Sequence, residues 1–472
     1  MSRINTNVSS LVARRVLASQ NDMLNSTLHR LSTGYRINNG KDDPAGLIAS
    51  ENLRTEQAAI GAAITNVARA NNIVSVAEGA LIEVNKLLLE LEDLVDRSAN
   101  TAGISDDERN ANQLQIDAIL DSINRIANST EFQGKKILSG TFAYNTSGVS
   151  TGNIAGVTIN AAKLPTDGYR AVVVEVTASA QVARLNYSGG TVGTSAVTIE
   201  VAGNLGTETL SFAASSNISA VAFAINQSRD LTGVTASSNG STLNFFSAQY
   251  GSSQFVSVRT LAGTFAVTGG DAGSNKDFGR DASVRINGTA ATTDGLKASV
   301  RNSSLSVDID LSSAFGTATG STTFYVVSGG ADFMISPRVS LAGLESIGVQ
   351  NIAASSLGDG IDGYISSLAT GQSNALNREN YAQSQRVVRS AQTVIAKLRG
   401  RLGAFQKNTL DTTANALKIA QENTTAAESI IRDADFAQET SNLTRSQILV
   451  QSATNVLRLS NAQPQNVLAL LG

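Results

Sequence analysis

Residues 60–95 constrain the fold more than any other part of the chain. Their apolar side chains alternate at spacings of three and four residues, without a break, over about five heptads. The members of this seam are Ile60, Ala63, Val67, Ala70, Val74, Ala77, Leu81, Val84, Leu88, Leu91 and Val95. Such a pattern predicts a coiled-coil helix, which at 1.5 Å per residue would be roughly 50 Å long. A helix of that length exceeds what one small compact domain can cover, so other long helices must lie beside it.

The ends of the chain supply candidates for those helices. A second seam in the C-terminal part consists of Val387, Ala391, Val394, Leu398, Leu402 and Phe405. Farther on, Phe436, Leu443, Val450 and Leu457 recur at strict intervals of seven, and the N-terminus shows Ile4, Val8, Leu11, Leu24, Leu28 and Leu31. Pro44 after Asp43 suits a helix start, and Ser105 to Glu108 has the spacing of a capping box.

Charge predicts how two of these helices pair. Residues 83–96 carry five acidic side chains and one lysine, whereas residues 386–401 carry five basic side chains and no acid. An antiparallel arrangement would bring acid to base. Exposed pairs contribute only about 0.2–1 kcal/mol each, so the charges would set the register and the apolar seams would supply the stability.

The middle of the chain, residues 141–345, has a different character. It is rich in Gly, Ser and Thr and contains short alternating apolar stretches. The predicted strands are 171–176, 196–201, 242–246, 255–261, 304–311 and 322–327. Residues 216–228 have helical spacing. We therefore expect one or two small β-rich domains inserted between the terminal helices, which makes the fold class α + β and multidomain.

Composition excludes most kinds of chemistry. The chain has no Cys and one histidine, His29, so neither a catalytic triad nor a thiolate metal site can be assembled. Most acidic pairs stand at predicted helix starts, where the helix dipole favours them. A net charge of −3 gives no case for nucleic acid, and no apolar run approaches the roughly 18 residues that span a membrane. We expect no catalysis, no cofactor and no metal.

The chain ends on "QNVLALLG", residues 465–472, with Val467, Leu468, Leu470 and Leu471 and no charge. A chain end is usually polar and frayed. Because a rod has too much surface to bury every seam within one molecule, we expect this end to be covered by copies of the same chain.

Several stretches resemble bacterial flagellin. They are "INTNVSSLVARRVL" (4–17), "LHRLSTGYRINNGKDDPAGLIASENLR" (28–54), "TEFQGKKILSG" (130–140) and "IRDADFAQETSNLTRSQILVQSATNVLRLSNAQPQNVLALLG" (431–472). Residues 212–258 also resemble an insert motif that recurs in flagellin and hook-filament outer domains.

The resemblance implies a subunit of the extracellular flagellar filament. Residues 1–40 with 430–472 would form an inner tube, 41–140 with 350–429 a coiled-coil rod with a small β element, and 141–349 one or two solvent-facing outer domains. The implied assembly residues are Ile4, Val8, Leu11, Leu28, Leu31, Phe436, Leu443, Val450, Leu457, Val467, Leu468, Leu470 and Leu471. The implied rod seam contains Ile60, Val67, Val74, Leu81, Leu88, Val394, Leu398 and Phe405.

The resemblance also implies partners and a route of export. These are further copies of the chain, an export chaperone on the segment Phe436 to Leu471, and the filament cap and hook–filament junction proteins. Export would use the flagellar type III apparatus without a cleaved signal peptide. Flagellins detected by the vertebrate innate-immune receptor carry Arg at the positions matched here by Glu90 and Glu92, which implies weak receptor activation.

Two alternatives remain open. A hook–filament junction protein shares flagellin-like termini but is present in few copies, so abundance in sheared filaments would separate the two. A surface adhesin would be indicated by glycan binding to the isolated fragment 141–345, with no filament formed by the whole chain.

Overall fold

The computed structural model describes residues 6–165, 168–302, 304–360 and 362–469. The chain divides into two compact units. The first contains the residues up to Arg69, the short segment Met334–Val339, and the residues from Asn408 onward. The second contains Ala70–Phe333 and Ser340–Lys407.

The first unit is helical. It holds α1 (Val8–Thr33), the beginning of α2 (Pro44–Ser98), α8 (Thr412–Arg432) and α9 (Phe436–Ala469). Asn7 caps α1 by accepting a hydrogen bond from the Ser10 backbone N–H, and α1 ends where Gly34 takes the left-handed conformation, φ 74°. The predicted start of α2 at Pro44 is confirmed, and Asp43 accepts a hydrogen bond from the Gly46 N–H.

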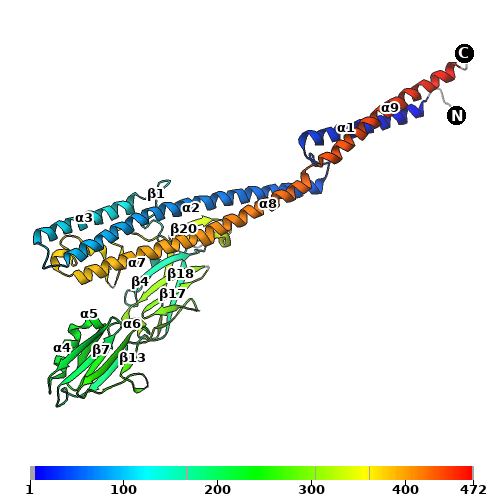
Figure 1. The fold of residues 1–472 in the computed structure, drawn as a ribbon. Coiled ribbons are helices and arrows are strands. Elements are labelled where there is room, and N and C mark those ends of the chain that lie inside the picture. Colours follow the sequence, from blue (N-terminus) through cyan, green and yellow to red (C-terminus); the bar gives the residue numbers. More distant parts are fainter. Residues whose placement is uncertain (1–5, 166–167, 303, 361, 470–472) are drawn as a thin grey trace. The chain divides into compact units, whose positions relative to one another are not determined.

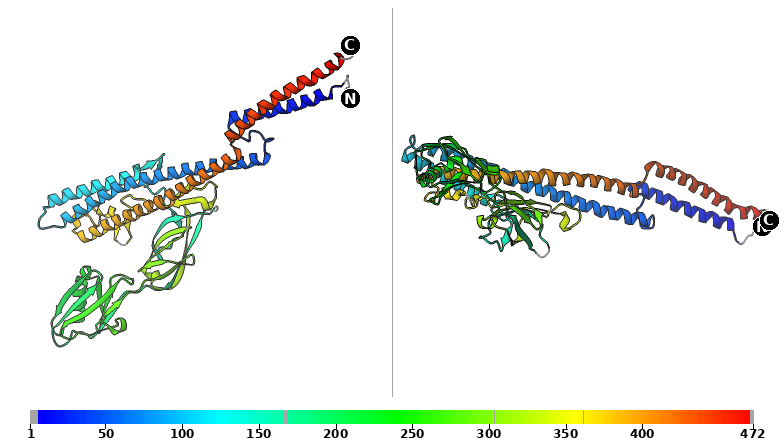
Figure 2. Two further views of the ribbon diagram at one scale, coloured as in Figure 1. Left: turned by 45° about the vertical axis from the view of Figure 1, so that its right-hand side comes forward. Right: turned by 90° about the horizontal axis from the view of Figure 1, so that it is seen from below.

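α1 and α9 run side by side and antiparallel (Figures 1 and 2). Next to them, the segment after α1 and the segment between α8 and α9 form a short β-bridge. The Arg36 N–H donates to the Arg432 carbonyl, and the Ala434 N–H donates to the Gly34 carbonyl. The Arg432 guanidinium lies 4.6 Å from the centre of the Tyr35 ring, which adds a cation–π contact to this bridge.

The helices of the second unit are the remainder of α2, α3 (Asp106–Ser129) and α7 (Tyr381–Phe405), with the short turns η3 (Ile365–Leu368) and η4 (Leu376–Arg378). A π-helical stretch, η5 (Gln406–Asp411), leads from α7 into α8. The Ser105 hydroxyl accepts from the Glu108 N–H at the start of α3, as the capping-box spacing predicts.

All eleven α2 residues of the predicted seam are buried. The antiparallel pairing of α2 with α7 is also confirmed, since Glu92 lies 2.9 Å from Arg389 and Glu78 lies 2.8 Å from Arg399. The prediction of which charged residues pair between α2 and α7 was only partly right. Glu78 lies outside it, and Arg401 donates to the Asn160 side chain and to the Gly348 carbonyl, not to an acid.

The β-rich middle contains two separate hydrophobic cores. The first lies between two sheets with strand orders β15-β14-β5-β19-β3 and β16-β17-β18-β4. Their strands are β3 (Asn145–Ser147), β4 (Ile154–Ala162), β5 (Arg170–Ala178), β14 (Ser283–Ile286), β15 (Thr289–Ala290), β16 (Thr292–Asp294), β17 (Lys297–Arg301), β18 (Leu305–Leu311) and β19 (Gly320–Ser328). The one-turn helix α6 (Ser313–Gly316) adds Phe315 to this core.

The second core lies between sheets β12-β6-β10-β9 and β13-β11-β7-β8, with α4 (Ile218–Gln227) and α5 (Arg229–Thr232) packed against them. The strands are β6 (Arg184–Ser188), β7 (Val197–Gly203), β8 (Thr207–Phe212), β9 (Val234–Ser238), β10 (Thr242–Ser247), β11 (Phe255–Ala262), β12 (Val267–Thr268) and β13 (Lys276–Phe278). All six predicted strands are confirmed, as β5, β7, β10, β11, β18 and β19, and the helical spacing of 216–228 corresponds to α4.

The remaining elements are short. They are the pairs β1 (Glu131–Phe132) with β2 (Lys135–Lys136), β20 (Ala331–Met334) with β21 (Leu344–Ile347), and β22 (Gly358–Asp359) with β23 (Gly363–Tyr364), together with the 3-10 turns η1 (Asp271–Gly273) and η2 (Leu341–Gly343). Within the described ranges, no helix is both long and apolar enough to cross a membrane.

Candidate functional site

The contact line between α1 and α9 is made of small and polar side chains. On α1, Ala13 and Thr27 are buried, and Gln20 lies midway between them at the same heptad spacing. On α9 the buried residues, again seven apart, are Glu439, Ser446 and Ala453. An ordinary helix pair buries Leu, Ile or Val along this line. The fully buried positions of the pair are therefore small or polar, and none of the larger apolar side chains described on these two helices is fully buried.

Polar contacts hold the two ends of this pair together. At one end the Asn7 Nδ2 donates to the Ser460 carbonyl at 2.7 Å, and the Ser10 hydroxyl donates to the Asn461 side-chain oxygen at 2.6 Å. At the other end Arg30 pairs with Glu439 at 3.3 Å. Hydrogen bonds of this kind contribute only about 0.5–1.5 kcal/mol each, so they orient the helices more than they stabilise them.

The larger apolar side chains of α1 and α9 are exposed or half-buried. Among the predicted assembly residues, Val8, Leu11, Leu28 and Phe436 are exposed, Val8 by 61% and Phe436 by 62%. The half-buried members are Leu31, Leu443, Val450 and Leu457. In the sevenfold repeat from Phe436 to Leu457, the first member is thus exposed, and the other three are half-buried and follow the fully buried positions by four residues.

Five predicted assembly residues have side chains that are not described. Ile4, Leu470 and Leu471 fall outside the described residues. Val467 and Leu468 belong to α9, but their side chains are not described. For these positions the assembly role stays a prediction from sequence.

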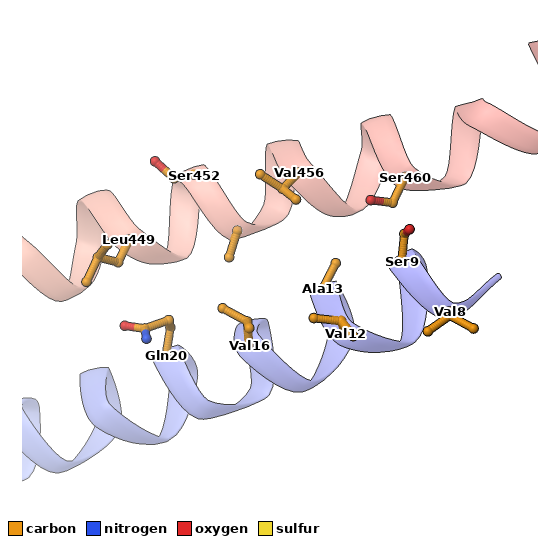
Figure 3. Close-up of a pocket in the computed structure, with 11 residues that line it drawn as sticks. Val8, Ser9, Val12, Ala13, Val16, Gln20, Leu449, Ser452, Val456 and Ser460 are labelled. Atoms are coloured by element: carbon orange, nitrogen blue, oxygen red, sulfur yellow. The ribbon is translucent and has the colours of Figure 1, made fainter. Parts of the chain in front are cut away.

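One side of the α1–α9 pair forms an apolar groove with a cavity volume of about 540 Å³ (Figure 3). Its walls are the valine and leucine side chains of both helices, with Ala13 and Ala453 on the floor. The lining residues are Val8, Ser9, Val12, Ala13, Val16, Gln20, Leu449, Ser452, Ala453, Val456 and Ser460. None of these described residues is charged. Uncharged, concave and apolar, the groove suits the apolar face of another protein segment.

The predicted rod residues on α2 and α7 are placed mostly as expected. Ile60, Val67, Val74, Leu81, Leu88 and Leu398 are buried, whereas Val394 and Phe405 are half-buried. On α7 the neighbouring Ile395 takes the buried position that Val394 was predicted to hold.

Glu90 and Glu92 differ in their surroundings. Glu90 is exposed. The Glu92 carboxylate accepts hydrogen bonds from Gln392 and Arg389, which lower the pKa of Glu92 below its usual value. Glu92 is therefore a structural partner of α7 as well as a surface residue.

A polar link missed by sequence reasoning joins α7 to the first β core. Arg401 donates to the Oδ1 of the buried Asn160 on β4, and the Asn160 Nδ2 donates to Asp308 on β18 at 2.6 Å. Burial lowers the pKa of Arg401 to about 10. Within the part of the chain that the structure describes, no three His, Cys, Asp or Glu residues gather as metal ligands would.

Comparison with known proteins finds family matches at both ends of the chain. The bacterial flagellin N-terminal helical region matches residues 4–143, and the bacterial flagellin C-terminal helical region matches residues 386–471. Flagellin E of Vibrio cholerae is 30% identical over 470 residues, covering 99% of this chain and 98% of that protein. The chain belongs to the flagellin family. Flagellins are the structural subunits of the bacterial flagellar filament, so the chain is a filament subunit.

Further comparisons agree with this membership. The flagellin hook IN motif matches residues 197–249, which contain α4 and most of the second β core. Flagellin B of Helicobacter pylori is 29% identical over 524 residues, covering 99% of both chains. Among solved structures, FliC from Burkholderia pseudomallei covers 72% of this chain and 99% of its own length at 15% identity, with a TM-score of 0.24. At that score the superposition supports no argument.

Proposed function

We propose that this flagellin polymerises by burying the outer apolar faces of α1 and α9 against other copies of the chain, which produces the extracellular filament used for swimming. The observation that carries the proposal is the inverted α1–α9 pair. Its fully buried positions are small or polar, while large apolar side chains such as Val12, Val456 and Phe436 are exposed. A soluble monomer gains nothing from that arrangement, whereas a polymer gains the burial of every outward side chain.

The energetics favour a polymer over a dimer. Fully burying a Val or Leu side chain contributes about 1.5–3 kcal/mol, so half-exposed residues such as Val12 and Val16 would add roughly 1 kcal/mol each. Association costs about 4–15 kcal/mol in lost translational and rotational freedom. The free energy gained by burying a few such side chains at one small contact therefore does not outweigh the cost of association. Each subunit must contact several neighbours at once. Head-to-tail contacts that do not close into a ring produce an open helix, which is the form of a filament.

In the architecture that goes with this function, residues 1–40 and 430–472 form the inner tube. Residues 41–140 and 350–429 form the coiled-coil rod, and residues 141–349 form solvent-facing outer domains. Support for the rod comes from the unbroken burial of the α2 seam from Ile60 to Val95. The two β cores support two outer domains. The protein performs no bond chemistry in this role.

Before assembly the same apolar faces need protection. We propose that an export chaperone covers the segment from Phe436 onward, where Phe436 and Ile448 are exposed. Export would proceed through the flagellar type III apparatus. The cap and the hook–filament junction protein would contact the ends of the filament.

Two pairs of valine substitutions test the assembly surface. Val12 and Val16 line the groove and are 45% and 43% exposed. Val173 and Val327, on a sheet of the first β core, are 41% and 38% exposed and serve as matched controls. After induced polymerisation, negative-stain microscopy should show filaments from the wild type and from the Val173→Ser/Val327→Ser protein. The Val12→Ser/Val16→Ser protein should stay monomeric, as should a chain lacking residues 456–472.

Equal filament formation by both valine pairs and by the truncated chain would refute this function for the α1–α9 surface. Far-UV circular dichroism of each monomer shows whether the helices are retained, which separates loss of assembly from loss of folding.

A further inference from the structure

Gln20 stands out among the residues of the apolar groove. It occupies the central position of the α1 contact line, seven residues from both Ala13 and Thr27. Its side chain lies at the end of the groove near Leu449 (Figure 3). The Gln20 Oε1 is buried and has no hydrogen-bond partner among the described residues.

An unpaired buried acceptor needs a donor from elsewhere. Leaving such a group without a partner is costly, and an apolar residue at this position would avoid the cost. The lining of the groove is uncharged, so a charged donor would have to lose its hydration with no counter-charge nearby. The fitting donor is neutral and belongs to a segment that is otherwise apolar.

The chain itself contains a segment of this kind. Residues 459–472, "LSNAQPQNVLALLG", carry no charged side chain, and neither does the lining of the groove. The amides of Gln465 and Asn466 directly precede the run of Val467, Leu468 and Leu470. A segment with this sequence can present an amide donor and an apolar face together.

We propose that Gln20 sets the register in which the C-terminal segment of a second copy docks into the groove, by accepting a hydrogen bond from the side-chain amide of Gln465 or Asn466. The inference rests on the assembly function proposed above and names the residue that makes assembly specific. In coiled coils a single polar residue within an apolar seam selects one register, because every other register leaves it unpaired. The valines of the groove would pack against the segment in several registers, whereas Gln20 would find its hydrogen-bond donor in only one.

The test uses the full-length Gln20→Leu protein, with Gln20→Ala as a second variant. The control is Asn21→Leu, at the adjacent, exposed position outside the groove. We expect Gln20→Leu and Gln20→Ala to polymerise into filaments of mixed helical symmetry by electron microscopy. Their critical concentration for polymerisation should rise about fivefold or more, because the incoming amide loses its acceptor. Asn21→Leu should keep the wild-type symmetry and critical concentration.

Combining Gln20→Leu separately with Gln465→Leu and with Asn466→Leu identifies the donor. The amide that pairs with Gln20 should show non-additive changes in critical concentration, by about twofold or more. Helicity of each monomer is checked by circular dichroism.

The outcomes separate the two proposals. If Gln20→Leu and Gln20→Ala filaments share the wild-type symmetry and critical concentration, the register role of Gln20 is overturned. Additive changes with both Gln465 and Asn466 overturn the choice of the C-terminal segment as occupant. A wild-type chain that never polymerises would overturn the assembly function itself.

Discussion

Two adjacent leucines on α2 offer a direct measure of the seam that organises the second unit. Leu88 is 0% exposed, whereas Leu89, the next residue, is 54% exposed. Replacing a fully buried Leu with Ala removes apolar contacts and leaves a cavity, at a cost of about 2–5 kcal/mol. The same replacement at Leu89 removes side-chain atoms that are largely in water, so it should cost about 1 kcal/mol or less. Helix propensity changes equally in both variants and cancels in the comparison.

Urea unfolding of the monomer, followed by the helical signal at 222 nm, measures both costs. With a urea dependence of about 3 kcal/mol per molar, a loss of 3 kcal/mol lowers the midpoint by roughly 1 M. We expect a shift of that size for Leu88→Ala and about 0.3 M or less for Leu89→Ala. Equal shifts in the two variants would refute the assignment of Leu88 to the seam and of Leu89 to the outer face of α2.

Three further predictions concern charged residues of the second unit. Because Gln392 and Arg389 lower the folded-state pKa of Glu92, its contribution to stability is present above the usual value near 4.5 and is lost as pH falls through the folded pKa. The fall in the free energy of unfolding between pH 7 and pH 3, measured by urea titration, should thus be smaller in Glu92→Gln, by about 1 kcal/mol or less. Arg401→Ala leaves Asn160 and a backbone carbonyl without their donor and should cost about 1–3 kcal/mol, measured as a lower melting temperature; an unchanged value would contradict the link between α7 and β4. Purified monomer should activate the innate-immune receptor weakly in reporter cells because of Glu90 and Glu92, and potency equal to that of a detected flagellin would rule this out.

The seam of α2 could be predicted from sequence because its evidence is local. Apolar residues at spacings of three and four define one face of a helix, whichever partner covers it. All eleven positions from Ile60 to Val95 are buried accordingly. The strands were predicted for the same reason wherever apolar and polar residues alternate, as in β18 and β19.

The contact between α1 and α9 could not be predicted in this way. The strongest repeat on α9 is the series from Phe436 to Leu457, and a search for apolar seams selects it. The fully buried line instead carries Glu439, Ser446 and Ala453, and the first two are polar residues that an apolar pattern leaves out. The physical reason we propose is that the larger apolar side chains of these helices contact other copies of the chain, which leaves small and polar residues for the contact within the subunit.

The order in which the strands pair could not be predicted from the sequence either. β5 lies between β14 and β19, which come more than a hundred residues later in the chain. Such distant partners are chosen by packing in the whole core, for which single-strand patterns hold no information. The Arg401–Asn160 link between α7 and β4 is missed for the same reason.

Hydrogen–deuterium exchange on α1 and α9, compared between free subunit and filament, tests the central claim most directly. A two-helix pair with a polar contact line should open readily, so its amides should exchange rapidly in the monomer. If the outward apolar faces are buried by other copies, the same amides should become strongly protected in the filament, with little change in the two β cores. Equal exchange of α1 and α9 in the monomer and in the filament would contradict the account.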